Sequence, residues 1–365
     1  MSAAERPTSH PFNMYQHMHD QPDAIAQVVP ANSEGIDRLA ASVADFDRLW
    51  IVGIGTSYHA ALMGEYFFRA FGGGLTAIAC HSFDFCLYGP PLTDRDAVIV
   101  ISHTGRKSYS VEALKRVRET SAALALITGE EGKQRHTELQ HVLTTTGPEG
   151  SATYTISYTA ALAVLAALAG AVGERRSGAP VAGIDALTSQ LPDAMRGALE
   201  TEQQIRSLAE VHSGHRKVWL SGAGPAGVTA LEAALKIKEA SYINAEALPV
   251  EQMLHGAFTS VEPDDLMILV APEGAGQSRT IELGAAAKDL GLGLFVVSDG
   301  TATDLREDAA GWVVVPAIAE PFSALTTLVP LQMLAYWYAI TRGTNPDSFR
   351  RDDPRFARAY TLVPL

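Results

Sequence analysis

Two glutamates and a lysine in the stretch LEAALKIKE (Leu231–Glu239) have the types and the spacing that acid–base chemistry requires. Glu232, Lys236 and Glu239 stand at positions i, i+4 and i+7, so a helix places all three on one face. A carboxylate can take and return a proton, and an ammonium group can stabilise negative charge on a nearby oxygen. The alternative is a solvated helix face with one Glu–Lys pair, worth roughly 0.2–0.5 kcal/mol.

A glycine-rich segment, GIGTSYHA, follows an apolar run and opens a helical pattern. Gly53 and Gly55 permit a tight turn there. Thr56 and Ser57 add hydroxyl groups beside the backbone N–H groups at a helix N-terminus. This combination suits an anion such as a phosphate group.

A second candidate loop, SHTGRKSYS, also lies between an apolar run and a helical pattern. Gly105 allows close approach of the backbone, and Lys107 adds positive charge. Hydroxyl groups come from Ser102, Thr104 and Ser108. An ordinary helix cap uses one or two such residues, so two hydroxyl-rich loops exceed what capping needs and predict a phosphate site.

Other nucleotide-binding patterns fit poorly. In a GxGxxG fingerprint the third glycine would fall at Tyr58, and no acidic residue follows about 20 positions later in the expected context. The chain contains no GxxxxGK[ST] motif. We therefore do not expect a dinucleotide or a P-loop nucleotide.

Three pairs of apolar segments recur in the same order along the chain. LWIVGIG begins at Leu49 and VWLSGAG at Val218, 169 positions later, and DAVIVIS and DLMILVA share that spacing. ALALITG and LFVVSDG form the third pair. This repetition predicts two duplicated domains. The second copy has GAGPAG and APEGAGQS where the first has its hydroxyl-rich loops, so we expect the phosphate site in the first copy.

Short apolar strands ending in glycine alternate with helices, which predicts an α/β fold with a parallel, doubly wound sheet in each copy. The expected helices are Tyr58–Phe71, Tyr109–Glu119 and Ala226–Tyr242, with a linker at Gly173–Pro180 and a helical segment near Asp185–Val211. The expected divisions are residues 1–34 (N-terminal segment), 35–175 (first domain), 176–212 (linker and helix), 213–345 (second domain) and 346–365 (tail). Ligands bind such sheets beyond the carboxyl ends of the strands.

The composition is that of a folded chain. Of 365 residues, 47% are hydrophobic and 19% charged, which is ample for packed cores. The net charge of -13 argues against a nucleic-acid partner, because neutralising phosphates needs clustered Lys and Arg. An anionic ligand must therefore be held by local N–H and hydroxyl groups.

Cysteines and apolar runs favour a cytoplasmic protein without a membrane partner. Cys80 and Cys86 fit no zinc site and are expected as small buried thiols. The start, MSAAERPTSHPF, lacks the apolar core of a secretion signal. The apolar run Ala160–Val172 is too short to span a bilayer and is expected as a core helix.

Five segments together resemble the double sugar isomerase (SIS) domain family: GIGTS, SHTG, LEAALKIKEASYINAEAL, MLHGAF and VPLQMLAYWYAITRGTNPD. The resemblance is greatest to the isomerase half of glutamine–fructose-6-phosphate amidotransferases. It extends from near Gln21 to the tail and is most specific in ALKIKEASYINAEA. It implies two tandem α/β domains and a reaction on a hexose or aminohexose phosphate that needs no cofactor or metal.

The resemblance also implies roles for single residues. Glu239 matches the residue that moves a proton between C1 and C2, and Lys236 and Glu232 match its helical companions. His255 matches a histidine that the neighbouring subunit supplies for ring opening, which implies a homodimer. The phosphosugar pocket is assigned to Thr56, Ser57, Ser102, His103, Thr104 and Lys107.

Three departures from the family pattern affect the expected activity. The motif resembling SQSGET is here SHTGRK, with His103, Arg106 and Lys107 altered. The family's tail lysine, which takes part in ring opening, falls at Ala359, with Arg358 beside it. No glutaminase segment precedes the repeat, so we do not expect synthesis of glucosamine-6-phosphate from glutamine.

An aldose–ketose conversion explains the three helical residues. Glu239 would take a proton from C2 and return it to C1, Lys236 would stabilise the enediol oxygens, and Glu232 would keep Lys236 charged. His255 could be an ordinary core histidine, but the glycine after it and its place 16 residues beyond Glu239 favour the family role. Glu149 follows a strand at the edge of the first domain and is a further candidate for contact with the sugar.

The leading hypothesis is a glucosamine-6-phosphate deaminase. It would open the ring, shift the C2 proton through Glu239 and let water release ammonia from the resulting imine. A ketose/aldose phosphate isomerase without deamination and a fructosamine-phosphate deglycase are the neighbouring alternatives. A sugar-phosphate sensor is the alternative from another class: the set of acid–base residues argues against it, and Ala359 weakens that argument.

Overall fold

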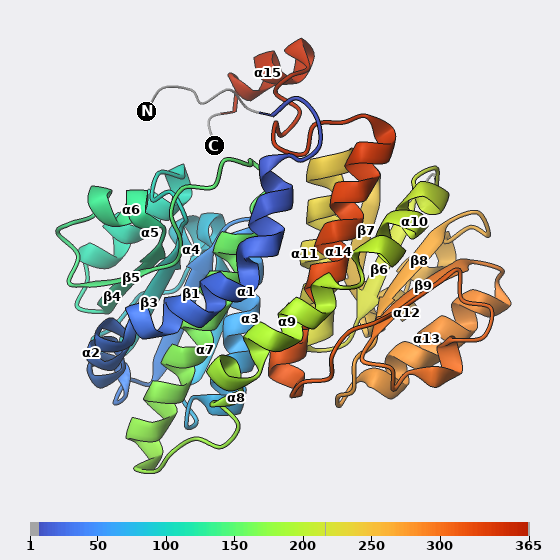
Figure 1. The fold of residues 1–365 in the computed structure, drawn as a ribbon. Helices are drawn as coiled ribbons and strands as arrows, with labels where there is room; N and C mark the ends of the chain where they lie inside the picture. Colours follow the sequence, from blue (N-terminus) through green and yellow to red (C-terminus); the bar gives the residue numbers. More distant parts are fainter. Residues whose placement is uncertain (1–6, 216, 364–365) are drawn as a thin grey trace. The chain divides into compact units, whose positions relative to one another are not determined.

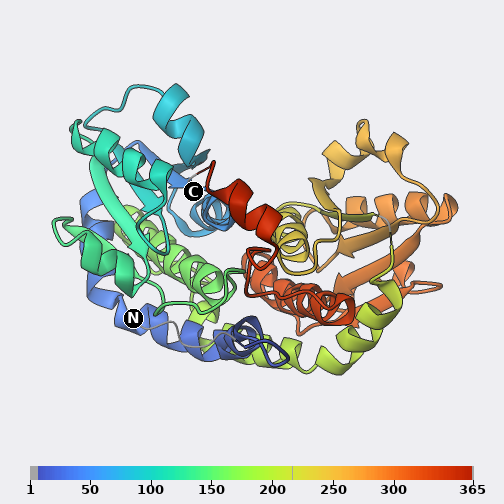
Figure 2. The same cartoon turned by 90° about the horizontal axis from the view of Figure 1, so that it is seen from above.

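The computed structural model describes residues 7–215 and 217–363, and these form two compact units. The first unit comprises Asp23–Glu149, Ile156–Ser189 and the described residues from Arg355 onward. The second comprises the described residues up to Pro22, Gly150–Thr155 and Gln190–Pro354. Each unit contains one five-stranded sheet, and Figures 1 and 2 show helices on both faces of each sheet.

The first sheet is parallel throughout and has the strand order β2-β1-β3-β4-β5. Its strands are β1 (Arg48–Gly53), β2 (Thr76–His81), β3 (Asp96–Ile101), β4 (Ala123–Thr128) and β5 (His141–Thr144). All six residues of β3 are buried, as expected for a central strand covered on both faces. The edge strand β2 is half-buried, so it lacks a continuous apolar run, and the sequence did not reveal it.

Helices cover both faces of the first sheet. The helices of this unit are α2 (Ser33–Val43), α3 (Thr56–Phe71), α4 (Ser82–Tyr88), α5 (Ser108–Arg118), α6 (Glu130–Arg135), α7 (Ile156–Ser177), α8 (Ala186–Ser189), which packs against α7, and, from Arg355, α15 (Pro354–Tyr360). α3 packs against α7 and β1, while α5 packs against α4, β3 and β4. α3 is the next element after β1 and α5 the next after β3, so the loops that lead into both helices start at the carboxyl edge of the sheet.

α7 corrects two expectations. It runs from Ile156 to Ser177, so it is longer than the apolar run Ala160–Val172 and includes the first residues of the expected linker Gly173–Pro180. By length and composition alone it could cross a membrane, so the argument from a short run was wrong. Within the first unit, 83% of its most apolar window is buried, and this burial makes it a core helix.

The second sheet is also parallel and has the order β10-β9-β8-β6-β7. Its strands are β6 (Val218–Gly222), β7 (Ala245–Pro249), β8 (Leu266–Val270), β9 (Gly293–Ser298) and β10 (Gly311–Val314). Read from β7, this order repeats that of the first sheet, β2-β1-β3-β4-β5, strand for strand. The duplication and the doubly wound α/β architecture are therefore confirmed.

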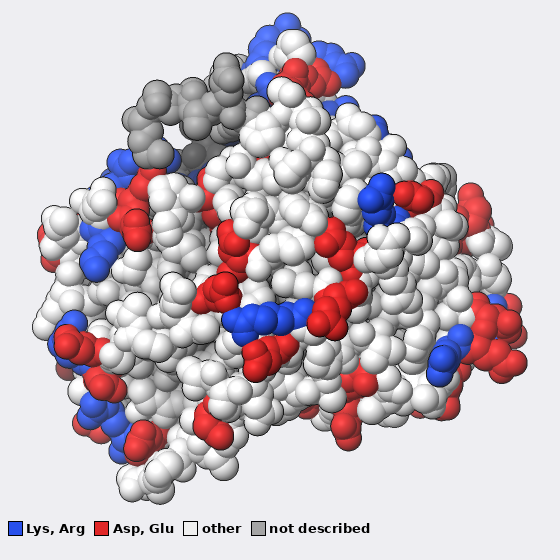
Figure 3. Space-filling model, in the orientation of Figure 1, with Lys and Arg blue, Asp and Glu red and all other residues white. Residues whose placement is uncertain are grey.

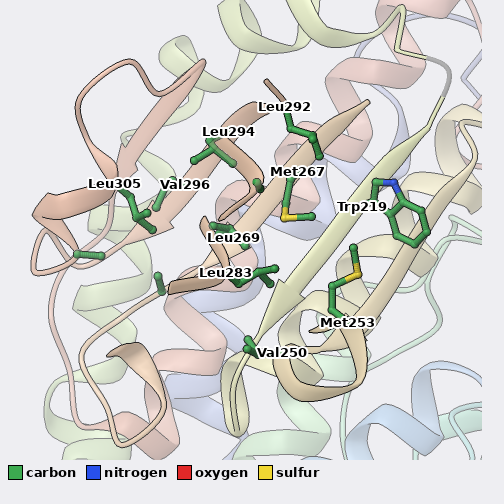
Figure 4. Close-up of a cluster of buried hydrophobic side chains, with 13 residues drawn as sticks. Trp219, Val250, Met253, Met267, Leu269, Leu283, Leu292, Leu294, Val296 and Leu305 are labelled. Carbon is green, nitrogen blue, oxygen red and sulfur yellow. The ribbon is translucent and has the colours of Figure 1, made fainter. Parts of the chain in front are cut away.

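The second unit is built on its own apolar core (Figure 4). Met267 and Leu269 of β8 and Leu294 of β9 pack there with Leu283 and Leu305. Its helices are α9 (Leu191–Leu199), α10 (Glu202–His212), α11 (Pro225–Ser241), α12 (Val250–Leu254), α13 (Gln277–Asp289) and α14 (Glu320–Arg342), with 3-10 turns η1 (Ala257–Ser260) and η2 (Thr303–Leu305). The single helical segment expected near Asp185–Val211 is instead the three helices α8, α9 and α10.

An N-terminal helix not foreseen from the sequence, α1 (Asn13–Ala31), begins in the second unit. The Asp347 carboxylate accepts hydrogen bonds from the backbone N–H groups of Asn13 and Met14, at 2.8 and 3.0 Å. A carboxylate suits a helix N-terminus because it satisfies N–H groups that lack a partner within the helix. α11 packs along α14 and carries Glu232, Lys236 and Glu239.

Candidate active site

The two hydroxyl-rich loops follow neighbouring strands at the switch point of the first sheet. β1 pairs directly with β3, and the chain crosses to β2 on one side and to β4 and β5 on the other. Sheets with this order bind ligands beyond the carboxyl ends of the two strands at the reversal. The loops after β1 and β3 begin at residues 54 and 102, at that edge.

The first loop depends on glycine. Gly55 has φ +59°, a conformation that other residues rarely adopt. A Cβ at Gly53 would lie 2.2 Å from the carbonyl oxygen of Ser57, so only glycine lets α3 start so close to β1. Thr56 and Ser57 are the first two residues of α3, and both are partly exposed. Their hydroxyl groups therefore stand at the N-terminus of a 16-residue helix.

The second loop turns its carbonyl groups toward the segment after β4. Thr128 Oγ1 donates hydrogen bonds to the carbonyl oxygens of Ser102 (2.6 Å) and His103 (3.1 Å). The N–H group of Gly129 donates to His103 O at 2.8 Å. His136 Nε2 lies 2.9 Å from Gly105 O, and because a carbonyl only accepts, Nε2 carries the hydrogen.

Because C=O and N–H point in opposite directions across a trans peptide, this arrangement aims the next N–H groups away from that segment. The N–H groups of Thr104 and Arg106 follow the anchored carbonyls of His103 and Gly105. Among the described residues, neither N–H finds a hydrogen-bond acceptor. The Ser102 hydroxyl is buried and also lacks a partner within residues 7–215 and 217–363. Unsatisfied donors of this kind are what an anion-binding loop offers.

Charged residues of this loop differ in their surroundings. Arg106 is exposed and pairs with Glu131 at 3.5 Å, so part of its charge is already balanced. Lys107 is the N-cap residue of α5 and is partly buried. The His103 ring lies against Gly129, where an added Cβ would come within 2.7 Å of it. Lys107 is thus the better placed of the two cations to serve an anion at the N-terminus of α5.

On α11 of the second unit, Glu232, Lys236 and Glu239 form one buried cluster. Lys236 Nζ lies 2.6 Å from Glu239 Oε2 and 3.3 Å from Glu232 Oε1. The Lys236 side chain is 1% exposed and that of Glu232 is fully buried, whereas Glu239 keeps 13% exposure. Lys238, on the other face, is exposed. The reading of these residues as a solvated helix face is therefore wrong.

Electrostatics keep Lys236 protonated. Burial alone lowers the pKa of this amine, but the charges of Glu232 and Glu239, with their hydrogen bonds, outweigh burial and raise the pKa above its ordinary value. The cluster thus holds two carboxyl groups around one ammonium group. Glu239 is its most exposed acidic member and the one through which the cluster can reach a ligand.

His255 and Glu149 are placed differently from this cluster. His255 follows α12, its side chain is 75% exposed, and Nε2 lies 3.0 Å from Glu251 Oε2 of the same chain. Glu149 Oε1 accepts a hydrogen bond from the N–H group of Ser157, at 2.8 Å, near the start of α7. One oxygen of Glu149 thus caps a helix, which is a structural role that the sequence reading did not anticipate.

The tail position that departs from the family pattern also lies on a helix. Ala359 and Arg358 are exposed residues of α15 in the first unit. An alanine offers no group for proton transfer, whereas the resemblance implies a lysine at this position.

Sequence reasoning missed the residues that hold the second loop. Thr128 ends β4 and His136 is the C-cap residue that follows α6, and neither lies in a recognisable motif. A usable signal was the pair Gly129 and Gly132: a Cβ on Gly132 would lie 1.8 Å from Thr128 Oγ1, so this glycine lets the helix approach the loop.

Charge on the surface is mixed. On the face shown in Figure 3, most Lys and Arg side chains lie beside Asp or Glu side chains. Among the residues that the structure describes, no group of three or more His, Cys, Asp or Glu side chains is arranged to hold a metal ion. The loops and the α11 cluster are therefore the features on which a function can be argued.

Comparison with known proteins adds sequence relatives. Isomerizing glutamine–fructose-6-phosphate aminotransferases of Pyrococcus horikoshii and Aeropyrum pernix are 31% and 32% identical to this chain over 335 and 358 residues. The alignments cover 92% and 93% of the chain and 56% of each relative. The chain thus spans little more than half the length of these curated relatives.

Solved structures share the fold. The C-terminal domain of glucosamine-fructose-6-phosphate aminotransferase from Francisella tularensis superposes with a TM-score of 0.84 at 23% identity, covering 93% of this chain and 98% of that one. A glucosamine-6-phosphate deaminase from Thermotoga maritima gives 0.72 at 23% identity, with 92% and 97% coverage. A tagatose-6-phosphate ketose/aldose isomerase from Escherichia coli gives 0.80 at 16% identity, with 93% and 95% coverage.

The family model of the SIS domain matches residues 42–171 and 213–342. These two matches contain both sheets, both candidate loops and the α11 cluster. The chain therefore belongs to the SIS domain family and carries two copies of the domain.

Proposed function

We propose that this protein is a phosphosugar isomerase that acts on an aminosugar phosphate, as a glucosamine-6-phosphate deaminase. The observation that carries the proposal is the buried cluster on α11, where Lys236 Nζ lies 2.6 Å from Glu239 Oε2. Burying two carboxylates with one lysine is costly for a structural element, and such clusters occur where acid–base chemistry is done.

In this proposal the loop residues and the α11 residues have different tasks. The phosphate group is held by the Thr104 and Arg106 N–H groups, the Ser102, Thr56 and Ser57 hydroxyls, and Lys107. Gly55 and Gly105 give the loops after β1 and β3 their shape, and His103 lines the loop after β3. Glu239 removes the C2 proton and returns it to C1.

Lys236 is the electrostatic partner in the reaction. Its raised pKa keeps it positively charged at neutral pH, so it cannot act as the base but can stabilise the enediol oxygens. Glu232, whose charge raises that pKa, holds the ammonium group in place. For an aminosugar, the same proton shift yields an imine at C2, which water cleaves to a ketone and ammonia.

Relatives support the substrate class. The curated relatives are named as isomerizing glutamine–fructose-6-phosphate aminotransferases, and a structure with the same fold is titled a glucosamine-6-phosphate deaminase. His255, exposed at the end of α12, would open the sugar ring from a neighbouring subunit of a homodimer, and Glu149 would contact the sugar.

The test is incubation with glucosamine-6-phosphate, following ammonia and fructose-6-phosphate together. We expect both products to appear in equal amounts from the wild-type protein. Glu239→Gln removes the base and should lower kcat by about 10²- to 10⁴-fold while binding of the sugar phosphate persists. Lys238→Gln, an exposed change on the same helix, is the matched control and should leave kcat unchanged.

Other outcomes identify the alternatives. Interconversion of an aldose and a ketose phosphate without ammonia would indicate a simple isomerase, and release of a larger amine from a fructosamine phosphate would indicate a deglycase. Saturable binding of sugar phosphate without turnover of any of these compounds would contradict the enzymatic proposal and favour a sensor.

A further inference from the structure

The second unit contains a counterpart of the phosphate loop, and its N–H groups are already in use. Thr104 and Arg106 of the first copy correspond, 169 positions later, to Glu273 and Ala275. The Glu273 N–H donates to Asp299 Oδ2 at 2.9 Å, and the Ala275 N–H donates to Glu320 Oε1 at 3.1 Å. In the first unit, the Thr104 and Arg106 N–H groups find no acceptor among the described residues. In the second unit, the corresponding N–H groups of Glu273 and Ala275 bind carboxylates of the chain itself.

Glu320 is fitted closely to this loop. A Cβ added at Gly274 would lie 2.3 Å from Glu320 Oε1, so the glycine makes room for the carboxylate. Gly274 corresponds to Gly105, the residue with φ +63° in the first copy, but does not share its positive φ. Gly274 therefore makes room for the Glu320 carboxylate, whereas Gly105 allows the backbone of its loop to turn.

A hollow lies at the same place. A small hollow, open to solvent and with room for roughly one water molecule, lies at the ends of β6 and β8, the two strands that flank the second switch point. Its polar lining consists of Gln277, Thr280, Glu320 and Ser323, and its floor is apolar. Helices α11, α13 and α14 all begin at residues that line this hollow or adjoin them.

We propose that the loop between β8 and α13 (residues 271–276) is an anion-binding loop masked by Asp299 and Glu320. These two carboxylates confine phosphate monoesters to the first unit. A carboxylate tethered to the same chain competes with any free anion at a high effective concentration. The masked site takes the same chemical class of ligand, a phosphate group, as the loop between β3 and α5. The assignment of phosphate to the first unit rests on the proposed function, whereas the masking itself does not.

The experiment is titration of the full chain with inorganic phosphate, observed by NMR of the backbone amides. In the wild type we expect Thr104 and Arg106 amides to shift and those of Glu273 and Ala275 to stay. In the double variant Asp299→Ala and Glu320→Ala, the second pair should also respond, and bound phosphate per chain should rise from about one to about two. The gain is a new property, so it cannot arise from misfolding.

A matched variant separates occupancy from charge. In Asp299→Asn with Glu320→Gln, the amide oxygens still accept from the same N–H groups, so the loop between β8 and α13 should still not bind phosphate. Folded alanine variants that bind no more phosphate than the wild type would overturn the proposal. An equal gain in the amide variant would overturn it too, because masking would then be electrostatic and not by occupancy.

The amide signals of Thr104 and Arg106 test the phosphate site of the first unit, and those of Glu273 and Ala275 test the masking in the second. If Thr104 and Arg106 do not respond in any variant while Glu273 and Ala275 respond in the alanine variant, the proposed phosphate site of the first unit fails and the masking stands. The reverse result preserves the proposed function and rejects the masking.

Discussion

At the scale of single residues, the burial of Glu232, Lys236 and Glu239 decides whether they form a solvated helix face or a buried cluster, which their spacing alone could not. Glu232, Lys236 and Glu239 share a helix face in either reading, but α11 is buried almost all round, so sequence periodicity could not show which face meets solvent. The structure places Lys236 inside and Lys238 outside. Breaking a buried cluster by removing one partner costs more than losing an exposed pair, so we expect substitutions here to destabilise the fold more than substitution of Lys238.

Another charged residue is buried in both copies. Asp96 accepts hydrogen bonds from Arg48, Trp50 and Thr93, and in the second copy Asp265 accepts from Trp219, 169 positions after Trp50. Burial alone raises the pKa of Asp96, but the Arg48 guanidinium and the other donors outweigh it and lower the pKa to about 2 from 3.8. The native state therefore holds Asp96 ionised.

This lowered pKa predicts how stability depends on pH. Because the folded pKa lies below the unfolded one, Asp96 contributes about 2 kcal/mol above pH 3.8, and this contribution is lost as pH falls toward 2. In Asp96→Asn, unfolding free energy should be lower at neutral pH and depend less on pH in that window. Urea denaturation at a series of pH values measures this, with Asp94→Asn, an exposed neighbour, as the control. Equal slopes for the wild type and Asp96→Asn would rule the assignment out.

At the scale of elements, central strands were predictable, and of the edge strands only β5, the strand expected before Glu149, was. β1, β3, β4, β6, β8 and β9 are apolar because both faces are covered, whereas β2 and β7 are largely half-buried. The loops after β1 and β3 were found from their glycines and hydroxyls. What holds them, such as Thr128 and His136, depends on strand order, and no local pattern encodes that.

The hydrogen bond from His136, the C-cap residue of α6, to Gly105 in the loop after β3 gives a prediction. His136 Nε2 fixes the Gly105 carbonyl, which aims the Arg106 N–H at the expected phosphate. His136→Ala should raise the dissociation constant for inorganic phosphate roughly threefold to tenfold, the worth of one hydrogen bond, without unfolding the protein. His136→Gln keeps an N–H donor and should restore part of the affinity. Loss of affinity in both variants alike, with an unchanged Arg106 amide signal, would assign His136 a purely packing role.

At the scale of the whole molecule, the sequence revealed the duplication but not how each unit is assembled from the chain. The repeat of apolar segments predicted two sheets, and their identical strand order confirms it. The second unit also draws on the start of the chain: Asp347 binds the N–H groups of Asn13 and Met14 across more than 300 residues. Contacts at such separation leave no periodic signal, so neither α1 nor its anchoring could be read from local pattern.

The last prediction concerns the assembly of the active unit. His255 is 75% exposed and pairs only with Glu251 among the described residues, so its imidazole is accessible to another copy of the chain. If His255 serves a neighbouring subunit, Glu239→Gln and His255→Ala proteins should each be inactive, and mixing them should create hybrid dimers with one intact site. Random exchange would give about a quarter of wild-type activity, since half of the dimers are hybrids with one of two sites restored. Ammonia release from glucosamine-6-phosphate, measured after exchange of tagged subunits has been verified, is the readout. Activity that stays at the level of the separate variants would show that Glu239 and His255 act within one chain or that His255 has no catalytic part.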